Sequence, residues 1–400
     1  MTGRIVELIK GKKYQVIIEA GKNPKTGRRS RIKRTVNGRK VEAEKLCADI
    51  IYKLEHGTYI KPDKTTLAEY LRKWLKTYAA NKAPSTYNGY KRIVEAHIIP
   101  QLGRVQLSKL QPMQIQEYYT NRLREGRRDG KGGLSAASVQ RHHALLRQAL
   151  HHAVKWGFLS RNPADLTEPP TPEQPEIFPL EPDQLDEVLE LAQGKRDEYL
   201  YIVAAYTGMR EGELLALTWN NVDLTGDDPV CRVRQTVGYI SGQGFVFRPT
   251  AKHKKGRREI PLMDITVTAL KQQKKMLAQE MLLNAQTYNR ENNLVFPNSV
   301  GEPMDPSGLG RRFKTIAREA GFPEVRFHDL RHTHATMLLK QGIHPKIVQE
   351  RLGHQTIGIT MDTYTHVIKG MQKEAVEKMN EYLKNKKRHQ KGTKEQKDRL

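Results

Sequence analysis

A dense run of prolines interrupts this chain near its middle. Six prolines fall within the stretch 168–182, "EPPTPEQPEIFPLEP": Pro169, Pro170, Pro172, Pro175, Pro179 and Pro182. Proline has no amide hydrogen and its ring clashes with the preceding helical turn, so this stretch cannot be helical and forms a stiff, extended connector. We therefore expect separate modules on either side of it, able to grip one extended partner from opposite sides.

The charge of the chain indicates what that partner is. There are 69 Lys and Arg against 44 Asp and Glu, a formal net charge of +25. The surplus is clustered, with 15 basic and 6 acidic residues in 1–60 and 8 and 2 in 384–400. Clustered positive charge favours nucleic acid. An anionic membrane is disfavoured, because no amphipathic helix with a bulky apolar face and no lipidation motif accompanies the charge.

Cysteine use and hydropathy indicate the compartment. Cys47 and Cys231 are too few for a disulfide framework and have no metal-ligand spacing. The N-terminus lacks the apolar segment of a signal peptide, and the longest apolar stretch, "YLYIVAAY" at 199–206, is too short to cross a bilayer. We expect a soluble, cytoplasmic protein.

Composition and periodicity predict three folded domains and a tail. We expect a small sheet with one helix, then an all-α domain, a linker, a mixed domain that is mainly α, and a basic tail, over residues 1–60, 61–166, 167–182, 183–383 and 384–400.

The first domain is predicted in some detail. "KKYQVIIEA" and "RRSRIKRTV" indicate two short strands joined by a turn at "NPKTG", and a helix follows from about Val41 to Leu54. A small basic sheet of this kind suits insertion into a DNA groove.

The second domain has helical periodicity throughout. We expect Thr66 to cap one helix, Ser85 to cap the next, and Pro100 and Gly103 to end that helix. A long helix over 134–159 carries four histidines, which we expect on a solvated or phosphate-facing surface: His142, His143, His151 and His152.

The third domain contains "FHDLRHTHATMLL" at 327–339, which allows two interpretations. His328 and His332 are four residues apart, as in the helix of zinc hydrolases. Alternatively, His328 and Arg331, three residues apart, face one phosphate. Zinc is disfavoured because Arg331 would oppose a dication, Asp329 is too short for the general base, and no third ligand follows at a recognised spacing. We expect neither metal nor cofactor.

Two further stretches supply positive charge. "YLYIVAAYTGMREGELLALTW" predicts a buried helix, a turn at Gly208 and a second helix that begins with Arg210, which Glu213 can orient. "FVFRPTAKHKKGRREIPL" predicts two strands joined by a tight turn that carries three lysines, Lys252, Lys254 and Lys255.

The last stretch supplies an imidazole and a phenol. "ERLGH" places His354 at a helix end broken by glycine, and "TIGITMDTYTH" places Tyr364 in a short helical segment. Such groups together suit phosphoryl transfer: arginines bind the non-bridging oxygens, imidazoles accept a proton or bind the phosphate, and an ammonium protonates the leaving oxygen. A phenol with an ordinary pKa of about 10 becomes a nucleophile among cations.

Four motifs, "TGMREGELLAL", "TAKHKKGRREIPL", "HDLRHTHAT" and "LGHQTIGITMDTYTH", in this order and spacing, resemble the tyrosine site-specific recombinases. The resemblance implies a catalytic domain of that type and an all-α core-binding domain. It also implies that Tyr364 forms a 3′-phosphotyrosyl link and that five residues activate the phosphate: Arg210, Lys252, His328, Arg331 and His354. Of the three lysines, the family pattern favours Lys252.

Further expectations come with this resemblance. Residues 1–60 are similar to the arm-binding domains of integrases from temperate phages and conjugative transposons. The resemblance implies double-stranded DNA attachment sites of core and arm type, a homotetramer that acts through a Holliday junction, and a bacterial, nucleoid-associated setting. A directionality factor and a DNA-bending protein are further candidate partners. A helix from near Gly370 docks on a neighbouring protomer or in cis.

Three alternatives stay open from the sequence. A type IB-like DNA-relaxing topoisomerase would use the same chemistry on arbitrary DNA, without an arm-binding domain. An Xer-type resolvase would lack that domain. A DNA-binding protein without enzymatic activity would explain the charge but not the six chemical groups at family spacing.

Overall fold

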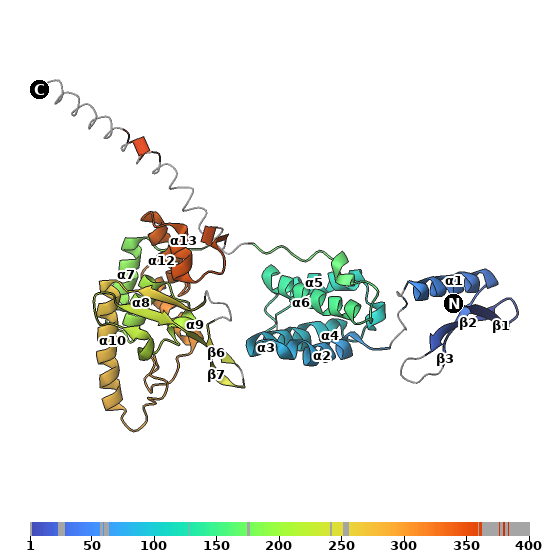
Figure 1. Ribbon diagram of the computed structural model, residues 1–400, viewed down its shortest axis with the longest axis horizontal. Coiled ribbons are helices and arrows are strands. Elements are labelled where there is room, and N and C mark those ends of the chain that lie inside the picture. Colours follow the sequence, from blue (N-terminus) through green and yellow to red (C-terminus); the bar gives the residue numbers. More distant parts are fainter. Residues whose placement is uncertain are drawn as a thin grey trace, which may run out of the picture. The chain divides into compact units, whose positions relative to one another are not determined.

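The computed structural model divides the chain into two compact units, residues 1–174 and 175–400 (Figure 1). It describes residues 2–22, 29–56, 59, 64–127, 129–173, 177–240, 242–250, 256–358, 360, 361, 376, 379, 380 and 383. Several predicted features lie outside these residues: the turn at 23–27, the three lysines of 251–255, Tyr364, most of the helix from Gly370, and the tail. Within the described residues, no helix is long and apolar enough to cross a bilayer.

Three antiparallel strands and one helix form the start of the first unit. The strands β1 (Gly3–Ile9), β2 (Lys13–Lys22) and β3 (Arg29–Asn37) lie in that order, and α1 (Lys40–Glu55) covers one face of the sheet (Figure 1). Their core is separate from that of the later helices and contains Tyr14, Val16, Ile18, Ala43, Cys47 and Ile50. The two predicted strands and the helix are confirmed. Strand β1 was not predicted, because the apolar residues of "GRIVELI" do not alternate and nearly all its side chains are exposed.

In the helical part of the first unit, the described residues form five α-helices around one core. They are α2 (Leu67–Thr77), α3 (Pro84–Ile93), α4 (Ile99–Leu102), α5 (Pro112–Glu125) and α6 (Ala136–Lys155), with 3₁₀ turns at 79–81, 107–109 and 163–166. The predicted Thr66 cap is confirmed: its hydroxyl accepts from the Glu69 amide, and the Glu69 carboxylate accepts from the Thr66 amide at 2.7 Å.

Two predicted helix boundaries are wrong. Ser85 does not cap α3, because Pro84 already occupies the first turn and Ala83 precedes it without a side-chain cap. The fixed φ of proline suits that first turn. The helix does not end at Pro100, because a π-helical turn over Val94–Ile98 lets the chain continue through α4; it ends at Gly103, as predicted.

Three of the four α6 histidines are not on a solvated surface, contrary to expectation. His142 is buried and its Nδ1 lies 2.9 Å from the Tyr118 hydroxyl. His143 makes the same bond to Tyr119 at 2.8 Å, and His152 Nδ1 accepts from the indole of Trp74 at 2.7 Å. Polar aromatic partners from α2 and α5 satisfy these rings, so the rings pack inward. His151 is exposed.

The second unit is mixed and mainly helical, as predicted. Its helices are α7 (Pro182–Ala192), α8 (Glu198–Thr207), α9 (Glu211–Leu214), α10 (Asp264–Leu283), α11 (Pro306–Glu319), α12 (Asp329–Lys340) and α13 (Pro345–Leu352), with a 3₁₀ turn at 219–221. Strands β4 (Val222–Asp223), β5 (Val230–Val233) and β8 (Arg258–Pro261) form one sheet, and β6 (Gln235–Ile240) and β7 (Gly244–Pro249) form a hairpin.

The hairpin predicted from "FVFRPTAKHKKGRREIPL" is wrong. Both strands exist, but β7 pairs with β6 and β8 pairs with β5, in different sheets. The stretch "QTVGYI" offers β7 a nearer partner, reached through a turn in which Gly242 and Gly244 have positive φ. A short glycine turn closes a hairpin more readily than a longer connection does.

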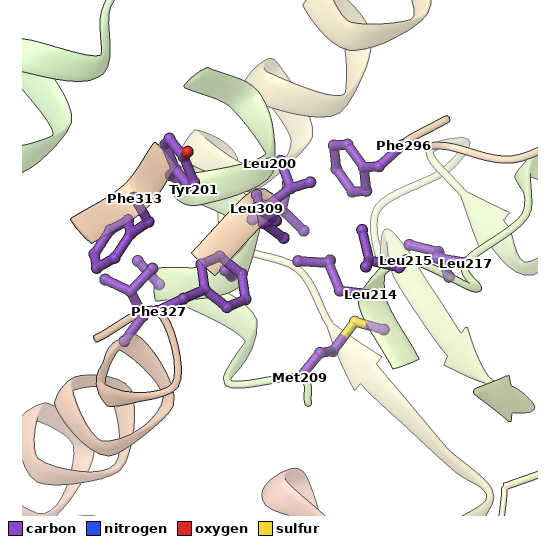
Figure 2. Packing of buried hydrophobic residues seen from close by; sticks show 14 of the residues in the cluster. Leu200, Tyr201, Met209, Leu214, Leu215, Leu217, Phe296, Leu309, Phe313 and Phe327 are labelled. Atoms are coloured by element: carbon purple, nitrogen blue, oxygen red, sulfur yellow. The ribbon is translucent and has the colours of Figure 1, made fainter. Parts of the chain in front are cut away.

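The core of the second unit surrounds α8 (Figure 2). Tyr201 on α8, Phe313 on α11 and Phe327 ahead of α12 pack edge to face, with ring centroids 5.2 Å apart for Tyr201–Phe313 and 5.7 Å for Phe313–Phe327. Phe327 directly precedes His328, so this packing fixes where α12 begins.

We predict that Phe313→Ala lowers the free energy of unfolding of this unit by about 3–5 kcal/mol, because it leaves a cavity where a fully buried ring was. Hydrogen exchange of α8 and α11 peptides, followed by mass spectrometry, measures the change. Leu282→Ala is the control, because Leu282 is 79% exposed. It should change the free energy of unfolding derived from exchange by less than about 0.5 kcal/mol. Equal protection in both variants would contradict this assignment of the core.

Candidate active site

The N-terminus of α12 presents two of the predicted site residues. His328 is the N-cap residue and is exposed, and Arg331, one turn later, is only 4% exposed. Buried Asp329 between them is held by Arg326, whose Nε and Nη2 each donate to its carboxylate at 3.0 Å. The ring of His332 meets that of His328 edge to face, with centroids 5.1 Å apart. Side-chain contacts thus tie down the start of this helix, and His332 in its second turn packs against His328 at its first.

The turn between α8 and α9 presents Arg210. Gly208 ends α8 in the left-handed region (φ 63°), and Arg210 is the N-cap residue of α9. Buried Glu213 accepts from the Arg210 amide at 3.0 Å and from its Nη1 at 2.8 Å. The predicted orientation of Arg210 by Glu213 is confirmed. A Cβ at Gly208 would lie 2.7 Å from Leu352 Cδ2, so only glycine lets α13 approach this turn.

The end of α13 joins these elements. A helix leaves its last carbonyls without partners inside the helix. Here the three carbonyls of residues 351–353, which we call the carbonyl triplet, each accept from an arginine of a different segment. The bonds are Arg258 Nε to Arg351 O (2.7 Å), Arg331 Nη2 to Leu352 O (2.8 Å) and Arg210 Nη2 to Gly353 O (3.0 Å). Arg331 Nη1 also donates to the Gly208 carbonyl at 2.6 Å.

His354 follows the triplet directly. Its Nδ1 lies 2.8 Å from the hydroxyl of buried Thr360, and its carbonyl accepts from Gln349 Nε2 at 2.8 Å. Burial and the charges of Arg331 and Arg210 lower the pKa of His354 to about 3, so its ring is neutral near pH 7. Partial burial of the ring and the same two charges also lower the pKa of His328.

The structure thus brings together four of the six predicted site residues, namely Arg210, His328, Arg331 and His354. Lys252 and Tyr364 lie outside the described residues. The predicted roles of all six remain predictions. Within the described part of the chain, no group of three or more His, Cys, Asp or Glu side chains lies together in a way that could hold a metal ion.

Sequence reasoning missed Arg258. Its side chain is 6% exposed and donates to both Glu213 oxygens, Nη1 to Oε1 at 3.2 Å and Nη2 to Oε2 at 2.8 Å. Burial acts to raise the pKa of Glu213, but Arg258 and Arg210 outweigh it and lower that pKa to about 2. A signal was present: Arg258 and Ile260 alternate on the buried face of β8, so a charge stands at a core position.

Comparison with known proteins agrees with this geometry. Residues 179–371 match the phage integrase family, and residues 66–123 match the N-terminal SAM-like domain of phage integrases. The chain belongs to the phage integrase family of tyrosine recombinases. The resemblance seen in the four motifs is therefore confirmed.

Two curated relatives of this integrase-family chain are similar over most of their length. A protein named "Tyrosine recombinase XerC-like" from Caldanaerobacter subterraneus subsp. tengcongensis is 29% identical over 357 residues, 86% of this chain and 90% of the relative. The ICEBs1 integrase of Bacillus subtilis is 26% identical over 386 residues, 94% of this chain and 100% of the relative.

Solved integrase structures share the fold. The Tn1549 transposon integrase in complex with a circular intermediate DNA has a TM-score of 0.64 and 21% identity, covering 75% of this chain and 95% of that one. A lambda integrase tetramer bound to a Holliday junction has a TM-score of 0.54 and 19% identity, covering 90% and 94%. The predicted fold class is confirmed.

We predict that the ion pairs of Glu213 make stability pH-dependent in acid. Because its pKa falls from 4.5 to about 2 on folding, its contribution is complete above pH 4.5 and is lost as pH falls toward 2. That contribution is on the order of 3 kcal/mol. Urea unfolding of wild type and Glu213→Gln should differ most near pH 6 and progressively less down to pH 3.5. A difference that is constant with pH would contradict the shifted pKa.

Proposed function

We propose that this recombinase is an integrase that inserts and excises a mobile DNA element, with Tyr364 as the nucleophile. The observation that carries the proposal is the carbonyl triplet, which holds Arg210 and Arg331 at the helix end that His354 follows. Lys252 and Tyr364 belong to the same four motifs, at the family's spacing. The family membership supports strand transfer as the reaction.

Each group has a defined role in the proposed reaction. Arg210 and Arg331 donate to the non-bridging oxygens of the scissile phosphate, where negative charge accumulates. Arg210 donates one hydrogen bond to Glu213 and one to the Gly353 carbonyl, and its side chain is 42% exposed. A guanidinium has five N–H donors, so others can face DNA. His328 and His354, whose pKa values are lowered, hydrogen-bond the phosphate or accept the phenol proton.

The bond changes balance without an external energy source. The Tyr364 oxygen attacks the phosphorus, and the bond from phosphorus to the 5′-oxygen breaks. The Lys252 ammonium gives the leaving 5′-oxygen its proton. The product is a 3′-phosphotyrosyl link that keeps the energy of the phosphodiester, so the reverse attack by a 5′-hydroxyl rejoins the strand without ATP.

The N-terminal sheet is the proposed arm-type DNA-binding surface. Ile17 pairs with Arg4 on one side and Lys33 on the other, and Glu19 pairs with Arg31. Paired residues share a face of the sheet, and Tyr14, Val16 and Ile18 occupy the face toward α1. Three basic side chains therefore lie on the opposite, exposed face: Arg4, Arg31 and Lys33.

Assembly follows from the same proposal. The lambda integrase of similar fold was solved as a tetramer on a Holliday junction. We extend a tetrameric state, core and arm attachment sites, and a helix from near Gly370 that docks in trans or in cis, to this chain. A directionality factor, a DNA-bending protein and a bacterial cytoplasmic location complete the proposal.

An Xer-type resolvase is the second candidate, and the name of the Caldanaerobacter relative favours it. The sheet domain and the full-length match to the ICEBs1 integrase favour an integrase.

We predict that Tyr364→Phe abolishes covalent protein–DNA linkage, because it removes the attacking oxygen alone. Nicked duplexes tiled across the DNA that flanks the coding region serve as substrates, and denaturing gels report the adduct. Affinity for the same duplexes, from fluorescence anisotropy, should change by less than about twofold, because one oxygen contributes little to a large, charge-driven interface. A surviving adduct would identify another nucleophile.

We predict that Lys33→Ala weakens arm-type binding. The slope of log affinity against log salt, which is negative, should become shallower by about 0.9, because one phosphate contact is lost. Anisotropy with the tiled duplexes at several salt concentrations measures both. Lys45→Ala is the matched control, because Lys45 is exposed on α1, away from the sheet's free face. Similar losses in the two variants would show non-specific attraction instead of binding by the sheet.

A supercoiled plasmid without any attachment sequence separates this integrase from a topoisomerase. We predict little relaxation by the wild-type protein, because cleavage needs a cognate core site. Agarose gels over several hours follow the topoisomers, with Tyr364→Phe as the background. Rapid, complete relaxation that requires Tyr364 would assign the chain to the topoisomerases.

A further inference from the structure

We propose that Arg258 is a positioning residue that neutralises Glu213, so that Arg210 meets the scissile phosphate with its full positive charge. This inference rests on the proposed function and adds to it a residue that does not touch DNA. Arg258 lies on β8, in a different segment from both Glu213 and Arg210.

The hydrogen bonds of Arg258 indicate that it acts on the substrate indirectly. Its side chain is 6% exposed, and three of its donors are spent within the protein, on the Arg351 carbonyl and on both Glu213 oxygens. Gly353, with φ +69°, lies against it, and a Cβ there would come within 2.9 Å of Arg258 Nη1. All three guanidinium nitrogens of Arg258 bond to protein groups, so we assign its influence to the groups that it binds.

The count of charges shows what that influence is. Glu213 lies between two guanidinium groups and bonds to both. One carboxylate with one arginine is neutral overall, whereas one carboxylate with two arginines keeps a charge of +1. Arg258 is enclosed and the Arg210 side chain is 42% exposed, so the remaining charge faces solvent through Arg210. Without Arg258, Glu213 would cancel the charge that the phosphate needs.

The surroundings of Glu213 contain no other cation that could replace Arg258 among the described residues. Arg210 faces it from the start of α9, and Arg258 from β8. Strand β6 meets α9 at Gly212 with the uncharged Thr236 and Val237. On the α13 side, His354 is neutral, and Arg351 is engaged by His334 and the carbonyls of Pro261 and Tyr206.

The test is a double-mutant cycle in the full-length protein. We expect Arg258→Met to slow covalent adduct formation on the tiled nicked duplexes by about 10–100-fold, because Glu213 then cancels the charge of Arg210. Adding Glu213→Gln to Arg258→Met removes the unneutralised carboxylate and should recover about tenfold of that loss. A residue needed only for packing predicts the opposite order, since the second substitution removes further hydrogen bonds. A double variant no faster than the single one therefore overturns the proposal.

The pH profile gives an independent readout. In Arg258→Met, burial of Glu213 is opposed by Arg210 alone, so its pKa rises above the wild-type value. Adduct formation in this variant should accelerate toward acid pH, relative to wild type, as Glu213 takes up a proton. The double variant has no carboxylate there and should lack this acceleration. Parallel profiles in the single and double variants contradict the proposal.

Two controls separate failure of this inference from failure of the proposed function. Wild type must form an adduct that Tyr364→Phe lacks. If wild type forms no such adduct, the proposed function is wrong, whatever the Arg258 variants show. Arg258→Lys keeps the charge but cannot make all three bonds, and we expect it to be folded by circular dichroism and faster than Arg258→Met. If Arg258→Lys is unfolded, or no faster than Arg258→Met when both are folded, Arg258 acts through packing and the proposal is wrong.

Discussion

The carbonyl triplet at the end of α13 is the interaction on which the site depends. Three guanidinium groups reach it from the α8–α9 turn, from β8 and from α12, and each satisfies one carbonyl that the helix leaves open. The negative end of the helix dipole favours such cations. Arg210 and Arg331 are more than a hundred residues apart in the chain, and this helix end brings them to one place and turns His354 toward them.

Several cations close together repel one another, and two groups of the site reduce this repulsion. Glu213 stays ionised between Arg210 and Arg258, with its pKa lowered to about 2, and His354 gives up its charge, with its pKa lowered to about 3. Two different responses thus relieve the same repulsion: a buried anion is kept and an imidazole stays neutral. The net charge that remains is positive. A phosphodiester can neutralise it, because its oxygens accept the paired hydrogen bonds that guanidinium groups donate.

The existence of helices and the glycines that end them were predicted better from the sequence than the partners of strands. Gly208 and Gly353 mark true helix ends because the left-handed conformation they adopt is a local property. The pairing of β7 and β8 was mispredicted because several strands compete, and only tertiary packing chooses among them. His142 was misplaced because its partner, Tyr118, lies on another helix. Arg258 was missed for the same reason: its role exists only where Glu213 and α13 meet.

Gly353→Ala tests the carbonyl triplet most directly, with Gly321→Ala as its control. Both glycines have positive φ, but a Cβ at Gly321 meets nothing within 4 Å, whereas one at Gly353 meets Arg258. The left-handed backbone alone should cost each variant about 1–2 kcal/mol of stability. We expect Gly321→Ala to form adduct at the wild-type rate and Gly353→Ala to be slower by about 100-fold, since small displacements of positioned groups cost that much. Equal rates in the two variants would show that the end of α13 does not organise the site.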